Sequence, residues 1–275
     1  MRIMQALLGM WLFTLVTVNA RANDSFIILQ STTSAVNSGL YEAILPAFSA
    51  SSGIKVRVVA VGTGQAIRNA RNGDGDVLLV HAKSAEEAFV KEGFGVRRYD
   101  VMYNDFVIVG PPSDPARIAG LTNASAALAQ IAAARAPFAS RGDNSGTHKK
   151  ELSLWRESGV DARGASGSWY RETGSGMGAT LNVAVGMSAY TLTDRGTWIS
   201  FKNKADFKIA VEGGDTLFNQ YGVVLVNPAR HKRIKAQAGQ AFIDWLLSAT
   251  GQAAITSYRL NGQQLFFPNA NPASN

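Results

Sequence analysis

The chain has 275 residues, 46% of them hydrophobic, and 27 basic against 20 acidic residues give it a formal net charge of +7. It contains no cysteine, which excludes disulfides and thiolate metal sites. No run of basic residues is interleaved with aromatic residues, so the composition gives no reason to expect a nucleic-acid partner.

The first residues have the pattern of a secretory signal peptide. Arg2 precedes an apolar run over 6–18, which is short for a membrane span, and residues 20–22 have the A-x-A form of a cleavage site. We therefore predict a signal peptide over 1–22 and a mature protein outside the cytoplasm. Its removal takes away Arg2 and Arg21, so 25 basic and 20 acidic residues leave a net charge of +5. This mildly basic balance suits an anionic ligand.

Short apolar strands alternate with helices along the rest of the chain. Buried strands are predicted at 25–30, 54–60, 76–82, 106–111 and 221–228. Helical spacing of apolar residues follows most of them, and Ser84 with Glu87 has the form of a capping box at the start of one helix. The alternation predicts an α/β fold with mainly parallel sheets.

Turns rich in hydroxyl and glycine residues lie where four predicted helices begin. In open α/β sheets, ligands bind at the carboxyl ends of the strands, and helix N-termini there present free N–H groups and a partial positive charge. One such turn is typical of an ordinary helix cap, whereas four together favour a small anion. The turns are Ser31-Thr32-Thr33-Ser34, Gly62-Thr63-Gly64-Gln65, Asn144-Ser145-Gly146-Thr147 and Gly178-Ala179-Thr180.

The segment "SRGDNSGTHKKEL", residues 140–152, admits several interpretations. Ser145 and His148 stand three apart at a helix start and could form a nucleophilic pair, although no G-x-S-x-G elbow surrounds the serine. Three histidines without cysteine are too few for a metal site. The RGD tripeptide lies between a predicted strand and a predicted helix, which does not suit a flexible adhesion loop.

We favour a fourth interpretation, an anion cradle. Arg141 would supply the one full positive charge, and Asp143, the one carboxylate we place nearby, would pair with it and orient it. The N–H groups of the next three turn residues would donate to the anion, together with two of their hydroxyls. These residues are Ser145, Gly146 and Thr147.

Long motifs resemble the tungstate-binding proteins of bacterial ABC uptake systems. They are "STTS", "VGTGQA", "DVLLVHA", "VMYNDFVIVGPPSDP", "SRGDNSGTHKKEL", "GMGATLN", "YTLTDRGT" and "LFNQYGV". The resemblance covers about 25–268, and it departs from the family only mildly at Ser31, where the family has a threonine. It implies a type II periplasmic binding protein with two α/β lobes, two crossover segments and the oxyanion between the lobes. It also implies that Arg141 is the key charged ligand.

The resemblance further implies the domains and the partners. Lobe one would comprise 23–107 plus 221–275, and lobe two 108–220. We expect a monomer that is not an enzyme, has no cofactor, and delivers its ligand to an ABC permease with its ATPase. The predicted oxyanion ligands are Ser31, Thr32, Thr33, Ser34, Thr63, Gly64, Arg141, Ser145, Gly146, Thr147 and Thr180, with Asp143 behind Arg141.

Whether the anion carries a proton distinguishes phosphate from tungstate and molybdate. Hydrogen phosphate needs an acceptor for its proton, whereas tungstate and molybdate need only donors. The first two turns contain no carboxylate, so we predict a site for tungstate, with molybdate not distinguished by the sequence. A phosphate-binding transport protein and a secreted hydrolase using Ser145 and His148 remain the alternatives.

Overall fold

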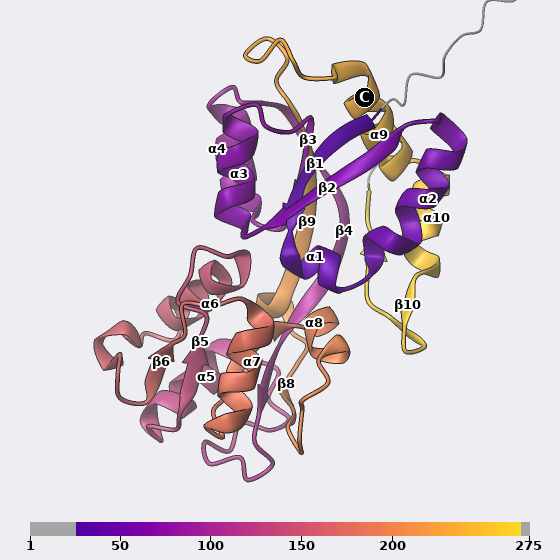
Figure 1. Cartoon of the computed structure of the whole chain (residues 1–275). Coiled ribbons are helices and arrows are strands. Elements are labelled where there is room, and N and C mark those ends of the chain that lie inside the picture. Colours follow the sequence, from indigo (N-terminus) through magenta and orange to yellow (C-terminus); the bar gives the residue numbers. More distant parts are fainter. Residues whose placement is uncertain (1–25, 271–275) are drawn as a thin grey trace, which may run out of the picture.

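A computed structural model describes residues 26–270, so the predicted signal peptide lies outside the described residues. The chain forms two lobes, each built from strands with helices packed against them (Figure 1). Two long strands pass between the lobes, β4 (Gly95–Gly110) and β9 (Phe218–Val226). The α/β two-lobed fold predicted from the sequence is therefore confirmed. The lobe boundaries at 107/108 and 220/221 fall within these two strands and stay a prediction.

The upper lobe in Figure 1 contains the first third of the chain and its end. Its elements are β1 (Phe26–Thr32), α1 (Thr33–Asn37), α2 (Leu40–Ser52), β2 (Lys55–Val61), α3 (Thr63–Arg71), β3 (Val77–Val80), α4 (Lys83–Lys91), α9 (Ala236–Leu247), α10 (Ala249–Ser257), β10 (Arg259–Leu260), β11 (Gln263–Gln264) and β12 (Phe267–Pro268). Two clusters of buried apolar side chains form its core, one around Ile27 and Leu29 and the other around Leu78 and Val80.

The lower lobe contains the middle of the chain. Its elements are α5 (Ala124–Ala133), β5 (Phe138–Ser140), α6 (Gly146–Glu157), a 3-10 turn (Arg163–Ala165), β6 (Tyr170–Glu172), α7 (Met177–Gly186), β7 (Thr191–Asp194), α8 (Arg195–Ser200), β8 (Lys208–Val211) and a second 3-10 turn (Asp215–Leu217). It has its own apolar clusters, around Ile108 and Phe138 and around Val107 and Leu181. Separate cores allow the lobes to move as units about the crossing strands.

The strand directions are more mixed than predicted. β1 pairs in parallel with β2 and with β3, and β5 pairs in parallel with β6. β9 runs antiparallel to β3 and to β4, and β4 runs antiparallel to β7 and β8. The expectation of mainly parallel sheets is wrong along β4 and β9, because these strands cross between the lobes in opposite directions and join both sheets.

The parallel strands bring the predicted turns to one place. The carboxyl ends of β1, β2 and β3 all point toward the lower lobe, since the three strands run in parallel. α1 and α3 begin directly after β1 and β2, at this edge (Figure 1). Within the described range 26–270, no helix combines the length and apolar character needed to cross a membrane.

Candidate anion-binding site

A small enclosed cavity lies where three helix N-termini meet between the lobes. The N-termini belong to α1 and α3 from the upper lobe and α6 from the lower lobe. The cavity is small, with a volume of about 10 Å³, close to what one water molecule needs, so it leaves room only for a compact ligand. The lining residues are Thr32, Thr33, Ser34, Val61, Gly62, Thr63, His81, Arg141, Ser145, Gly146 and Thr147.

The lining contains eight of the eleven residues predicted from the sequence, and the helix caps explain how they are held. The Thr32 side chain accepts a hydrogen bond from the Ala35 N–H at the start of α1, at 3.4 Å. The Ser145 side chain does the same for the His148 N–H at the start of α6, at 3.1 Å. Each cap fixes the position of the first helical turn, so the N–H groups before it face the cavity edge.

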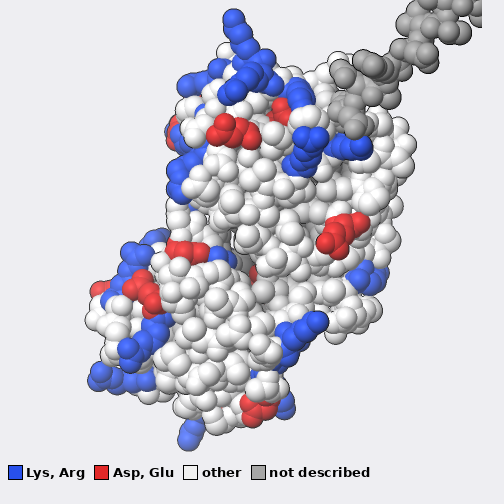
Figure 2. Space-filling view, viewed as in Figure 1, with Lys and Arg blue, Asp and Glu red and all other residues white. Residues whose placement is uncertain are grey.

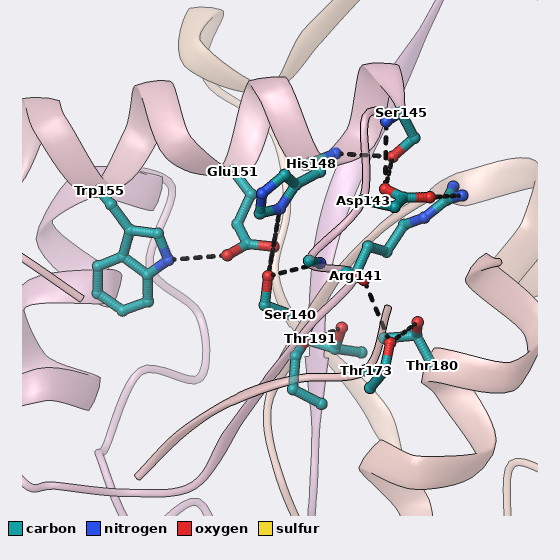
Figure 3. A network of polar contacts seen from close by, with 12 residues as sticks. Ser140, Arg141, Asp143, Ser145, His148, Glu151, Trp155, Thr173, Thr180 and Thr191 are labelled. Carbon is teal, nitrogen blue, oxygen red and sulfur yellow. Dashed lines mark hydrogen bonds and ion pairs between the residues drawn. The ribbon is translucent and has the colours of Figure 1, made fainter. Parts of the chain in front are cut away.

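Arg141 is the one basic side chain among the described lining residues, and it is 5% exposed. Its guanidinium donates to Asp143 Oδ2 at 2.6 Å, and its Nε is buried with no partner among the described residues. Asp143 Oδ1 in turn accepts from the Ser145 N–H at 3.1 Å and the Ser145 hydroxyl at 2.5 Å (Figure 3). One carboxylate therefore holds both the guanidinium and the cap of α6, and it leaves a donor of Arg141 free.

The sequence had suggested that Asp143 is the one carboxylate near Arg141, but the structure shows a second, Asp194. Asp194 is 1% exposed and caps α8 through hydrogen bonds from the Thr197 hydroxyl and N–H, at 2.7 and 2.8 Å. Burial raises the pKa of Asp194, whereas the Thr197 hydrogen bonds and the charge of Arg141 lower it. The sequence could not predict this neighbour, because Asp194 follows Arg141 by more than fifty residues.

Ser145 and His148 do not form a nucleophilic pair. The Ser145 hydroxyl donates a hydrogen bond to Asp143 and accepts one from the backbone N–H of His148, not from its ring. The His148 ring instead lies 3.2 Å from Ser140 Oγ through Nδ1 (Figure 3). Through Nε2 it lies 3.4 Å from Arg163. A serine without a histidine to take its proton is not an activated nucleophile.

Two predicted side chains lie away from the cavity. Ser31 is 0% exposed and its hydroxyl contacts the Tyr41 hydroxyl at 2.6 Å and the Leu79 carbonyl at 2.8 Å, inside the upper lobe. The Thr180 hydroxyl contacts the Thr173 hydroxyl at 2.8 Å, behind the Arg141 segment (Figure 3). The prediction that these hydroxyls face the ligand is not met.

Gly64 and Gly146 join the lobes instead. The Gly64 N–H donates to the Asn144 carbonyl at 3.3 Å, and the Gly146 N–H donates to Thr63 Oγ1 at 3.1 Å. A Cβ on Gly146 would lie 2.8 Å from the His81 ring, so glycine is what allows this approach. The Gly146 N–H is thus bonded to the Thr63 oxygen, and the Thr63 hydroxyl proton stays available to a ligand.

His81 is the cavity residue that sequence reasoning missed. Its Nδ1 lies 3.0 Å from Asn219 Oδ1, and Asn219 Nδ2 donates to Asn104 Oδ1 at 2.6 Å. This orientation of Asn219 places the ring proton on Nδ1, so Nε2 accepts from the Ser34 hydroxyl at 3.2 Å. Burial lowers the pKa of His81 to about 4. The charge of Arg141 also lowers this pKa, whereas the hydrogen bond with Asn219 raises it. The ring is therefore neutral, and its one acceptor atom, Nε2, already accepts a hydrogen bond from Ser34.

The comparisons with known proteins identify the family of the chain. The model of a PBP superfamily domain, that of the periplasmic binding proteins, matches residues 17–250. The tungstate-binding protein TupA of Peptoclostridium acidaminophilum is 48% identical over 248 residues, which cover 89% of this chain and 86% of that protein. This chain belongs to the TupA family. 

Solved structures of the TupA family superpose on this chain. The tungstate-binding protein TupA from Desulfovibrio alaskensis G20 has 46% identity and a TM-score of 0.80, covering 90% of this chain and 100% of that one. The tungstate ABC transporter protein from Geobacter sulfurreducens has 47% identity and a TM-score of 0.77, covering 85% and 98%.

Proposed function

We propose that this protein binds tungstate, or the similar molybdate, in the cavity between its lobes. The observation that carries the proposal is the composition of the cavity wall. Residues with hydroxyl side chains line it from both lobes together with the Arg141 guanidinium, and no acidic residue is among the described lining residues. Named members of the TupA family bind tungstate.

Charge supports a dianion. An oxyanion leaves water at high cost unless hydrogen bonds and charge replace its hydration shell. Each N-terminus of α3 and α6 acts as about half a positive charge, and Arg141 adds a full one, offset by its pairing with Asp143. A donor-lined cavity with this balance holds a small anion without a cluster of lysines.

Proton counting favours tungstate over hydrogen phosphate. The strongest acceptors at the cavity are already engaged, because His81 Nε2 accepts from Ser34 and the carboxylate of Asp143 accepts from Arg141 and Ser145. The proton of hydrogen phosphate would have to be accepted by a hydroxyl that could otherwise donate to the anion, and a buried polar group left without its partner costs about 1–3 kcal/mol. Tungstate and molybdate bring no proton.

The cellular setting completes the proposal. The protein works in the periplasm as a monomer, its two lobes (23–107 plus 221–275, and 108–220) close on the anion, and the loaded form passes it to an ABC permease driven by its ATPase. It performs no chemistry on the ligand. The relative named as a putative ABC transporter anion-binding protein in Haloferax volcanii, 48% identical over 249 residues, supports this setting.

Calorimetric titration of the mature protein with tungstate, molybdate, sulfate and phosphate tests the proposal. We expect tungstate to bind with about 5- to 150-fold higher affinity than phosphate, and to raise the melting temperature with the logarithm of ligand concentration above its Kd. Tighter binding of phosphate would make the phosphate transporter the correct assignment. Turnover of an ester or phosphoester that stops in Ser145→Ala would establish the hydrolase alternative.

A further inference from the structure

A second, larger hollow lies next to the anion cavity. It has a volume of about 630 Å³ and is lined by the first turn of α4 from the upper lobe, by α6 from the lower lobe and by the start of β9. His81 and Gly146 line both this groove and the enclosed cavity. The groove therefore leads from the surface to the wall of the anion site.

The walls of the groove are basic on both lobes. Lys83 lines it from the upper lobe, and Lys149, Lys150 and Arg156 line it from the lower lobe, whereas Asp215 is the one acidic residue among its described lining. Figure 2 shows lysine and arginine side chains on the left side of both lobes, with a few acidic side chains among them, and α4 lies on this side of the upper lobe in Figure 1. The groove thus presents an excess of positive charge to solvent.

These cations have no carboxylate partners among the described residues. Some arginines elsewhere in the protein are paired, such as Arg98 with Glu86 at 2.6 Å and Arg195 with Asp105 at 2.5 Å. None of the four groove cations lies within 4 Å of a carboxylate oxygen in residues 26–270, so no direct ion pair neutralises them.

The two adjacent lysines of the groove are partly buried. Partial burial and then the nearby Arg68 lower the pKa of Lys149, and partial burial lowers the pKa of Lys150, against the opposing effect of Glu157. Partial burial brings these charges close to the low-dielectric wall of the groove, where water screens them less.

We propose that this basic groove is the entrance of the anion site, which captures the free dianion electrostatically and guides it to the cavity. The inference rests on the proposed function and adds to it the path and the rate of capture. A cleft lined by one sign of charge with low-dielectric walls focuses the field and raises on-rates by about 10- to 1,000-fold. Because salt screens charges over about 10 Å at 0.1 M, the capture rate must fall as salt rises.

Stopped-flow association with tungstate, followed by intrinsic tryptophan fluorescence, tests the groove. In Lys149→Gln/Lys150→Gln we expect the association rate constant to fall about 5- to 10-fold at 20 mM salt, with a flatter salt dependence, and the dissociation rate constant to stay within about twofold. Lys83→Gln adds a further decrease from the opposite wall.

A matched control separates the groove from total charge. Lys232→Gln/Arg233→Gln also removes two positive charges, from the exposed loop between β9 and α9 at the far end of the upper lobe (Figure 1). Equal slowing in this control, or an unchanged association rate in Lys149→Gln/Lys150→Gln, would overturn the inference. Neither result would affect the proposed function, which depends on the equilibrium affinities of the unmodified protein for tungstate and phosphate.

Discussion

Replacing Gly146 with alanine tests whether contact between the lobes contributes to anion binding. The new Cβ would lie 2.8 Å from His81 Cε1, 3.0 Å from Thr63 Oγ1 and 3.1 Å from His81 Nδ1, where ordinary contact begins at 3.4 Å. Overpacking of this kind costs about 1–3 kcal/mol, and His81 cannot easily move because Asn219 and Ser34 hold both ring nitrogens. We expect tungstate affinity to fall about 5- to 150-fold.

The cost should appear in binding and not in the stability of the free protein. The clash arises between the lobes, so opening at β4 and β9 relieves it, and the first turn of α6 accepts alanine readily. Calorimetry with tungstate and thermal unfolding without it measure the two quantities separately. Gly178→Ala is the control, because Gly178 is also in the first turn of a helix, α7, and its Cβ would meet nothing within 4 Å. Unchanged tungstate affinity in Gly146→Ala would refute this role of the lobe contact.

Three further predictions concern single side chains. Arg141→Ala should weaken tungstate binding in calorimetry by at least about 30-fold, because a buried dianion loses its full counter-charge and Asp143 loses its partner; near-native affinity would mean that the helix ends suffice. Ser31→Ala should lower the free energy of unfolding by about 1–3 kcal/mol in urea titrations and change the tungstate Kd less than about twofold, since its hydroxyl bonds inside the upper lobe. The His81 ring should show no protonation shift in NMR between pH 5.5 and 8; its depressed pKa of about 4 stabilises the fold fully above the unfolded value of about 6.5, and that contribution, about 3 kcal/mol, is lost as pH falls through 4.

The sequence predicted the turns well because their signals are local. A strand that ends in hydroxyl and glycine residues before a helix is visible within ten residues, and three of the four turns, 31–34, 62–65 and 144–147, supply residues to the cavity wall. The error at Ser31 came from the strand end, which was predicted at residue 30 and lies at Thr32. Because successive side chains of a strand point to opposite faces, Ser31 turns into the lobe while Thr32 reaches the cavity.

Other features depend on contacts that no local pattern carries. His81 reaches Asn219 across 138 positions, and Asn219 reaches Asn104 across 115, so the neutral tautomer of His81 follows only from the folded strands. The predicted cap of α4 was wrong for a related reason. The helix begins after Ala82, whose N–H donates to Glu86 Oε1 at 2.6 Å. Glu86 is fully buried, so its carboxylate takes the position at the helix start that the sequence had assigned to the capping box at Ser84.

The division of the site between the lobes explains why binding and closure should be one event. The upper lobe supplies the N-termini of α1 and α3, and the lower lobe supplies Arg141 and the N-terminus of α6. Either half alone offers a dianion only part of the donors that would replace its water, so an open protein holds the anion weakly. Arg141, whose buried Nε has no partner among the described residues, and Thr63, which accepts from Gly146 of the opposite lobe, line the same cavity. We therefore expect the anion to favour the closed arrangement by its difference in affinity for the two states, which is the only way that a ligand can shift such an equilibrium.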